Sequence, residues 1–446
     1  MVFNSFSFIF IFFPVLFLLY YFVTPDRRRL LLCAASLVFY GIGVRSAPWQ
    51  LGLLAGMTAF GMLGCALFRK RRRRRPWLLW LWVAVIAAPL VFVKLAGLFT
   101  ANPPSLPLGL SFYTFQLIAF VVYAFRGGRP DALGVAAGTL MFPKLISGPI
   151  ADPAQILETS RMPRRHLAMI DQGLQDFIIG LAYKVIIADH LAGVLGQIRT
   201  WGVRGVSVQL AWIGVLGYSL QLYFDFWGYS RMAIGVGRML GMELPENFNH
   251  PYCSKTVGEF WRRWHITLGQ WFKNYVYIPL GGSRNGFGRM VLSTLTVWVL
   301  TGIWHGAGWN YVCWGLMMFL FIMLERLIYG KLMSRTYVLG HIYIPVVIGL
   351  SWIFFITPDI SEAVAYFQRL FGGATDGFMP NDWLDVLRWC WPYLSLGVVC
   401  CTPLPSMLWR RVSRRAVTWV ALFALFWVCM YFMGTAASDP FLYFSF

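Results

Sequence analysis

Charged residues are scarce in this sequence, and acidic ones most of all. Charged side chains make up 13% of the 446 residues, about half of the share that is usual in soluble domains. Hydrophobic residues make up 58%, and the mean hydropathy is +0.62. This composition excludes an ordinary soluble globular protein and predicts an all-α, polytopic integral membrane protein.

Cysteine patterns of known chemistry are also missing. The eight cysteines lie mostly in apolar segments, and none forms a C-x-x-C pair or a Cys/His spacing typical of zinc ligands. We therefore expect small buried side chains rather than a disulfide framework or a metal site.

Basic residues outnumber acidic ones by 38 to 18, which gives a net charge of +20. The excess falls in short clusters between apolar runs, at 69–75, 161–165 and 410–415. Such clusters flank membrane spans on the cytoplasmic side and meet anionic lipid headgroups. They therefore predict topology and lipid contact rather than nucleic-acid binding. The segment 358–388 is the only acidic loop, and the same scheme places it outside.

Apolar runs continue through nearly the whole chain, without a recognisable soluble domain, linker or internal repeat. We expect a single transmembrane domain over residues 1–446, with roughly 11 spanning helices plus re-entrant and interfacial helices. The apolar run 133–150 contains Pro143, Gly148 and Pro149, which predict a broken or re-entrant segment.

The apolar runs 286–304 and 309–328 predict a helical hairpin with His305 at its tip. From Arg289, at the expected membrane surface, to His305 is roughly 24 Å of helix, less than the roughly 30 Å thickness of the hydrocarbon core. His305 is therefore expected inside the membrane, where a polar group without a partner costs several kcal/mol. Three small residues are expected to leave open space beside its ring, and two tryptophans to wall that space: Gly306, Ala307 and Gly308, and Trp304 and Trp309.

Two motifs in this part of the chain resemble those of a known family. RRWHITLGQWFKNYVYIPLGGSR (262–284) and LTGIWHGAGWNYVCWG (300–315) are similar to motifs of the membrane-bound O-acyltransferases, above all of the bacterial branch that O-acetylates alginate. Further matches span most of the chain: LPLGLSFYTFQLIAF (106–120), MFPKLISGPIADP (141–153), LQLYFDFWGYSRMAIGVGRMLGMELPENFNHPY (220–252) and SWIFFITPDISEAVAYFQRLFG (351–372). The resemblance implies a multi-pass enzyme of the bacterial cytoplasmic (inner) membrane, with 250–309 as its catalytic region.

O-acyl transfer needs a base that removes the hydroxyl proton, a positioned thioester and stabilisation of the oxyanion. Histidine titrates near neutral pH and suits the role of base. The resemblance assigns this role to His305, which matches the family's catalytic histidine, and the expected burial agrees. His265 is the second candidate, nearer to the cytosol, where it would position the acyl donor or polarise its carbonyl. An interfacial histidine on a basic amphipathic helix explains His265 equally well.

The expected acyl donor is acetyl-CoA, or an acyl carrier protein, on the cytosolic side, and no bound cofactor is expected. Its phosphates suit basic side chains interleaved with aromatic ones. The candidates for donor binding are Arg262, Arg263, Trp264, Lys273 and Arg284. Contact with lipid headgroups explains the same basic residues.

Asp225 is a carboxylate within an apolar run, and such residues are functional candidates. It either lines a substrate tunnel or forms a structural ion pair with Arg231. Three further residues are candidates for lining the tunnel: Trp304, Trp309 and Asn310. The family pattern has acidic residues where this chain has Arg231 and Tyr123, and these departures bear on the acceptor or partner.

The resemblance implies transfer of an acetyl group across the membrane for O-acetylation of an extracytoplasmic polysaccharide. Relatives of this kind often pass the acyl group to a periplasmic or extracellular partner that resembles SGNH esterases. Two alternatives stay open: D-alanyl transfer to teichoic acid from a carrier protein, and a polysaccharide or lipid transporter. Against transport, the sequence shows no inverted repeat of the kind found in many secondary transporters.

Overall fold

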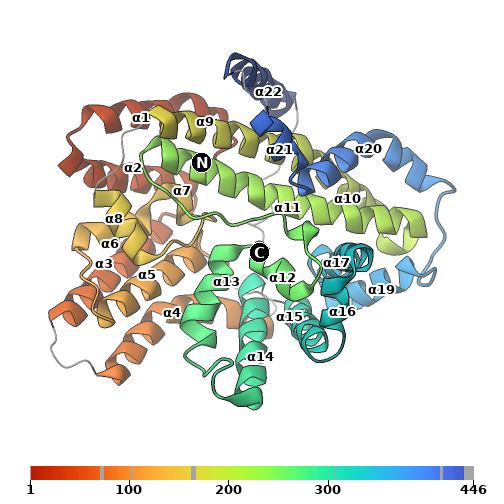
Figure 1. The fold of residues 1–446 in the computed structure, drawn as a ribbon, viewed down its shortest axis with the longest axis horizontal. Helices are drawn as coiled ribbons and strands as arrows, with labels where there is room; N and C mark the ends of the chain where they lie inside the picture. Colours follow the sequence, from red (N-terminus) through yellow and green to blue (C-terminus); the bar gives the residue numbers. More distant parts are fainter. Residues whose placement is uncertain are drawn as a thin grey trace. The chain divides into compact units, whose positions relative to one another are not determined.

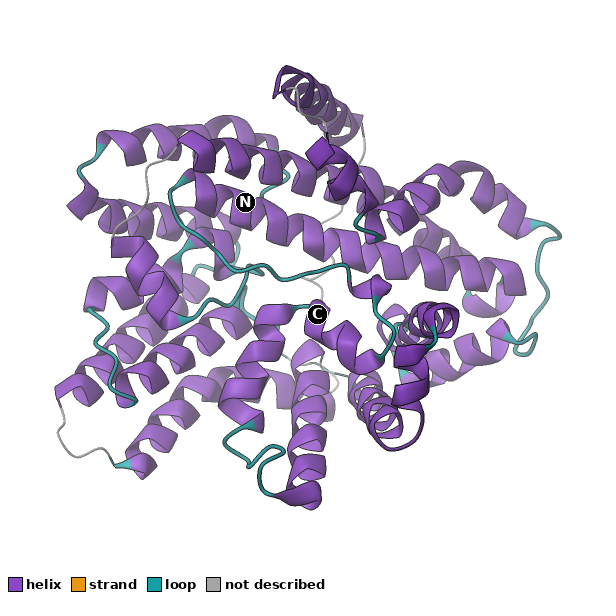
Figure 2. Cartoon of the chain, in the orientation of Figure 1, coloured by secondary structure: helices purple, strands orange, loops and turns teal. Residues whose placement is uncertain are grey.

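Helices joined by loops and turns make up the whole of the described chain. The computed structural model describes residues 2–70, 75–100, 102, 104–161, 167–306, 308–411 and 415–435, and no strand occurs among them (Figure 2). The all-α prediction is confirmed. The basic clusters 69–75, 161–165 and 410–415, on which the predicted orientation depends, lie largely outside these residues.

Seven of the described helices are long and apolar enough to cross a membrane: Trp49–Arg69, Pro76–Phe99, Leu167–Trp201, Gly286–His305, Trp309–Arg335, Tyr337–Ile356 and Ala416–Thr435. Two shorter apolar helices cover Phe8–Phe22 and Leu110–Phe125. The polytopic class is confirmed, whereas the number of roughly 11 spans stays a prediction.

The chain divides into two compact units. Unit 1 comprises Met1–Gly180 and Tyr229–Glu246, and unit 2 comprises Leu181–Gly228 and Asn247–Phe446. The predicted catalytic region 250–309 lies entirely in unit 2. The single domain expected over residues 1–446 stays a prediction.

The first unit contains the N-terminal helices (Figure 1): η1 (Phe8–Phe12), α1 (Phe13–Phe22), η2 (Pro25–Arg27), α2 (Arg28–Gly43), α3 (Trp49–Lys70), α4 (Pro76–Phe99), α5 (Leu110–Phe125), α6 (Ala132–Leu140), α7 (Phe142–Leu145), α8 (Pro153–Arg161) and most of α9 (Leu167–Ala182). Its apolar run 133–150 is broken as predicted, because α6 ends at Leu140 and only the short α7 follows before α8. Gln116 of α5 holds the break in place: its amide group donates to the Ala151 carbonyl (3.1 Å) and accepts from Lys144 Nζ (2.7 Å).

The second unit contains the remaining helices: η3 (Tyr183–Ala188), α10 (Asp189–Trp201), η4 (Val203–Gly205), most of α11 (Val208–Met239), η5 (Pro251–Cys253), α12 (Val257–Arg263), α13 (Ile266–Phe272), η6 (Lys273–Tyr277), α14 (Gly286–His305), α15 (Trp309–Leu324), η7 (Glu325–Tyr329), α16 (Gly330–Arg335), α17 (Tyr337–Ser351), α18 (Ile353–Ile356), α19 (Ile360–Leu370), α20 (Asp382–Cys401), α21 (Leu404–Arg411) and α22 (Arg415–Thr435).

The predicted hairpin is present, with α14 and α15 packed against each other. Two glycines allow the close approach. A Cβ at Gly302 would lie 2.5 Å from the Tyr311 carbonyl oxygen, and one at Gly315 would lie 2.4 Å from that of Trp298. Real Cβ contacts are longer than this, so any larger residue would force the two backbones apart.

The acidic segment 358–388, expected as a loop outside the membrane, contains α19 and the first turns of α20, and its placement outside stays a prediction. The Asp359 carboxylate accepts from the Glu362 amide (2.9 Å) and caps α19, a D-x-x-E signature that the sequence carries. The buried Arg369 donates to the Val206 carbonyl (2.6 Å), which attaches α19 to the chain before α11.

Candidate active site

Two short helices, α12 and α13, bring His265 into unit 2. Thr256 caps α12 by accepting from the Glu259 amide (3.1 Å). His265 lies between the helices with φ 44° and ψ 54°, a left-handed conformation that is uncommon outside glycine. Asn247 holds the start of α13, since its carbonyl accepts from the Ile266 amide (2.9 Å) and its side chain from the Thr267 hydroxyl (2.7 Å).

His265 is buried, with 3% of its surface exposed. Its ring meets the Phe226 ring edge to face, with 4.7 Å between ring centroids, and lies 6.1 Å from the Trp304 ring. Burial lowers the pKa of His265 to about 3, because a charged imidazolium would lose its hydration. A neutral buried ring does not fit the alternative of an interfacial histidine on an exposed amphipathic helix.

His305 ends α14 and is surrounded by aromatic rings. Its ring centroid lies 4.6 Å from that of Trp304, 5.0 Å from Trp314 and 5.1 Å from Phe355. The small residues after His305 do not leave the expected space, because a Cβ at Gly306 would lie 2.0 Å from the Tyr311 ring and one at Gly308 would lie 2.2 Å from the Asn310 side-chain oxygen, while Ala307 lies outside the described residues. His305 is thus held in a packed aromatic environment, 9% exposed.

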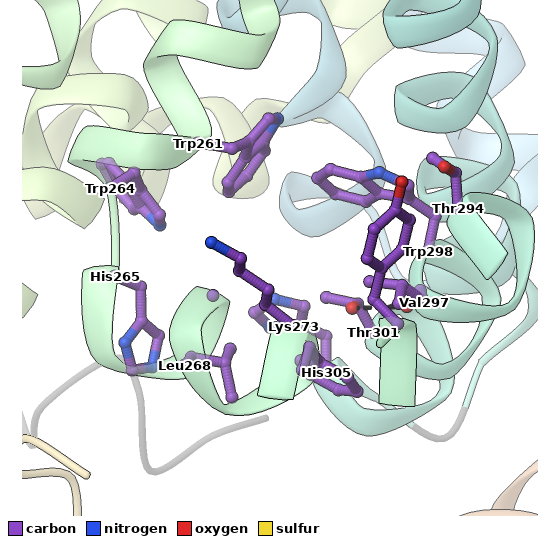
Figure 3. Close-up of a pocket in the computed structure, with 13 residues that line it drawn as sticks. Trp261, Trp264, His265, Leu268, Lys273, Thr294, Val297, Trp298, Thr301 and His305 are labelled. Atoms are coloured by element: carbon purple, nitrogen blue, oxygen red, sulfur yellow. Dashed lines mark hydrogen bonds between the residues drawn. The ribbon is translucent and has the colours of Figure 1, made fainter. Parts of the chain in front are cut away.

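Both histidines line one cavity of about 230 Å³ (Figure 3). Its walls come from α12, α13, η6 and α14: Trp261, Trp264, His265, Leu268, Gly269, Phe272, Lys273, Tyr277, Thr294, Val297, Trp298, Thr301 and His305. The lining is mostly apolar, so water inside it would find few hydrogen-bond partners. In Figure 3 the Lys273 side chain extends into the space bordered by Trp261 and Trp264.

Several cavity residues were not predicted from the sequence. Thr294, Val297, Trp298 and Thr301 were missed, although they precede His305 at steps of three and four residues and so share its face of α14. Extending that spacing back from the histidine would have found them.

The predicted donor residues separate into two groups. Trp264 and Lys273 line the cavity, whereas Arg262, Arg263 and Arg284 are not among its described lining residues. Arg263 pairs with Glu259 on the same helix (2.6 Å), and Arg262 and Arg284 are exposed. The structure therefore places one of the four predicted basic residues, Lys273, at the cavity.

Asp225 forms a buried ion pair. Its carboxylate lies 2.7 Å from Lys184 Nζ, which also pairs with Asp189 (2.6 Å). Arg231 pairs with Asp176 (2.7 Å), and the alternative pair of Asp225 with Arg231 stays a prediction. Asp176, the acidic partner of Arg231, lies on α9. The sequence showed that Arg231 departs from the family pattern, but it did not show this partner.

The other predicted tunnel residues also lie outside the described lining of the cavity. Trp304 is buried between His265 and His305, and Trp309 is half exposed at the start of α15. The Asn310 amide donates to the carbonyls of Phe354 (2.7 Å) and Thr357 (3.2 Å), which fixes α15 to the end of α18.

A second cavity, of about 880 Å³, lies in the same unit and borders the aromatic residues around His305. Tyr311 and Phe355 form part of its wall, and Phe355 contacts the His305 ring. The remaining wall is more polar and includes Arg199, Arg204, Glu362 and Asp376. His305 thus borders one cavity directly and reaches the wall of the other through a single aromatic ring.

The chain belongs to the membrane-bound O-acyltransferase family, whose model matches residues 68–361. It is therefore an O-acyltransferase that uses an acyl donor, and a multi-pass protein of the bacterial inner membrane. The match covers both histidines and all residues of the first cavity.

Among curated proteins, the chain is 34% identical to the probable alginate O-acetylase AlgI of Pseudomonas aeruginosa, over 84% of this chain and 76% of that protein. It is 31% identical to the peptidoglycan O-acetyltransferase of Helicobacter pylori, over 83% of this chain and 80% of that protein. A teichoic acid D-alanyltransferase of Streptococcus thermophilus is more distant, at 28% identity over 55% of this chain and 63% of that protein.

Proposed function

We propose that this enzyme transfers an acetyl group from acetyl-CoA toward an extracytoplasmic polysaccharide, with His305 as the general base. The observation that carries the proposal is the placement of two buried histidines, His305 and His265, in the wall of one largely apolar cavity. The names of the more similar relatives, an alginate O-acetylase and a peptidoglycan O-acetyltransferase, support acetyl as the group and a polysaccharide as the acceptor.

The reaction joins the acceptor oxygen to the acetyl carbonyl carbon and breaks the bond between that carbon and sulfur. His305 removes the acceptor proton as the oxygen attacks, and it returns a proton to the leaving thiolate. His265 is neutral at neutral pH, so it contributes a hydrogen bond and not a positive charge. Exclusion of water from the apolar cavity protects the thioester from hydrolysis.

The donor side is proposed at the open part of the first cavity. Lys273 is the exposed cation at its edge, and Trp264 supplies an aromatic wall, which suits the phosphates and pantetheine arm of a CoA thioester. An acyl carrier protein presents the same pantetheine arm and would use the same entrance. The segment that carries Lys273 is the one predicted to face the cytosol.

The acceptor side is proposed at the second cavity. This cavity is bordered by Glu362 of α19 and by Asp376, within the acidic segment predicted to lie outside. Its polar wall suits a saccharide hydroxyl or the loop of a partner protein. We propose that an SGNH-esterase-like partner in the periplasm receives the acetyl group there and passes it to the polysaccharide.

The test is acetyl transfer by purified protein with labelled acetyl-CoA, the partner and the acceptor. His305→Gln keeps a hydrogen-bonding group but cannot take up the proton, so transfer should fall by roughly 10²- to 10⁴-fold. The matched control is His341→Gln, a partly exposed histidine on α17 that should leave transfer unchanged. Near-normal transfer by a well-folded His305→Gln variant would refute the assignment of the base.

D-alanyl transfer from a carrier protein is the second candidate, favoured by the more distant D-alanyltransferase relative. Supplying a D-alanyl carrier thioester in place of acetyl-CoA decides between the two. The transporter alternative is set aside, because the family is one of acyltransferases.

A further inference from the structure

Glu325 is a buried carboxylate on the turn that follows α15. It is 8% exposed, and its two oxygens accept hydrogen bonds from the backbone amides of Val257 and Gly258, the latter at 3.1 Å. These are the first two amides of α12, and the third is capped by Thr256. The first amides of a helix have no acceptor within the helix, so a side chain of another helix completes the start of α12.

A tyrosine lies beside this carboxylate. The Tyr343 hydroxyl of α17 is close enough to Glu325 to act on it electrostatically, and it lies 3.0 Å from the Tyr329 hydroxyl. Glu325 is therefore held by the two amides that start α12 and lies next to α17. Buried carboxylates are rare without such partners.

Glu325 joins α12, which lines the first cavity, to the end of α15, which packs against the lining helix α14. α12 supplies Trp261 and Trp264 and leads directly to His265. α15 is the second arm of the hairpin and packs along α14, which ends at His305. A shift of α12 against α15 would move the His265 side of the cavity relative to His305.

We propose that Glu325 is a positioning residue for acyl transfer, which holds α12 against the hairpin and so sets the geometry between the two histidines. This inference rests on the proposed function, since it concerns the same cavity. Glu325 is not one of the described residues that line the cavity. It therefore acts through α12 and not by contact with the substrate.

The carboxylate chemistry explains why a glutamate is needed. Each of the two neighbouring N–H groups bonds to its own oxygen, and a carboxylate presents two acceptor oxygens. Glutamine has nearly the same shape but places an NH₂ group against one of the amides. Glu325→Gln therefore disturbs the contact while it preserves volume.

The test compares Glu325→Gln with wild type in the acetyl-transfer assay, with kinetic constants expressed per folded, monodisperse molecule. Misplacement of a cavity wall should lower kcat/KM by roughly 10²-fold and raise the KM for the donor. A role in stability alone would reduce the yield of folded protein but leave both constants unchanged. The control is Asp385→Asn, an exposed carboxylate paired only with Arg388 in the described part of the chain, which should match wild type. Unchanged constants in folded Glu325→Gln would overturn the inference.

Tyr343→Phe provides a second, milder variant, which removes the hydroxyl that acts electrostatically on Glu325. Tyr343→Phe should also lower kcat/KM. In the double variant with Glu325→Gln, kcat/KM should be little lower than in Glu325→Gln alone. If Glu325→Gln does not fold, wild-type kinetics in Tyr343→Phe overturns the inference by itself. Absence of transfer by wild type with its partner present refutes the proposed function instead, so the two failures are distinguishable.

Discussion

The buried, neutral His265 makes the stability of this protein depend on pH in a defined way. An unfolded histidine titrates near its ordinary value of 6.5, whereas burial lowers the pKa of His265 to about 3 in the folded state. Between these values the unfolded state binds the proton and the folded state does not. Stability therefore rises with pH across this window and falls as the solution is acidified.

The magnitude follows from the two pKa values. At pH 5 the unfolded histidine is almost fully protonated and the folded one is still neutral, which lowers the free energy of unfolding by about 2 kcal/mol relative to pH 7. His265→Asn removes the titration. It also suits the backbone, because asparagine adopts the left-handed conformation at this position more readily than most residues.

The assay is unfolding in detergent at pH 7 and at pH 5, for wild type and for His265→Asn. The packing that His265→Asn loses lowers the free energy of unfolding equally at both pH values. This loss therefore cancels when the value at pH 5 is subtracted from the value at pH 7. The variant should therefore lose about 2 kcal/mol less than wild type on acidification. His341→Asn, at a partly exposed histidine, should behave as wild type. Equal acid sensitivity of wild type and His265→Asn would refute the buried neutral state.

Two further predictions concern the buried ion pair and the topology. Asp225→Asn should destabilise the protein by up to about 3 kcal/mol in thermal unfolding, because the buried Lys184 loses one of the carboxylates beside it. Donor KM should stay unchanged, and a raised KM at unchanged stability would restore the tunnel role. Cysteine at Ser361 should react with an impermeant reagent in intact cells, and cysteine at Arg284 should not; the reverse pattern would contradict the predicted orientation.

Features set by the local pattern of residues were predicted well. The hairpin ends agree closely, because Gly286 and the run before His305 determine where an apolar helix starts and stops. The break near Pro143 was predicted because proline lacks the amide that a continuing helix needs. The capping signature at Asp359 was equally local and could have shown that the acidic segment contains a helix.

Features set by contacts between distant residues were predicted poorly. The partner of Asp225 is Lys184, which enters through the π-helical turn η3 that links α9 and α10, and nothing in either local pattern pairs them. Gly306 suggested open space, but the ring that fills it belongs to Tyr311 on the other arm of the hairpin. The basic residues near His265 looked equivalent in the sequence. In the structure, α13 lies between Arg263, which forms an ion pair at the end of α12, and Lys273, which lines the cavity.

The contact of the hairpin arms at Gly302 and Gly315 determines at which stage the catalytic base loses its conformational entropy. With backbone packed against backbone, the end of α14 that carries His305 cannot slide along α15, and the rings of Trp304, Trp314 and Phe355 surround its imidazole. The base therefore loses its conformational freedom during folding, and no further ordering of the base is needed in each turnover. The mobile participant is then the thioester, which has to reach a base that is already in position.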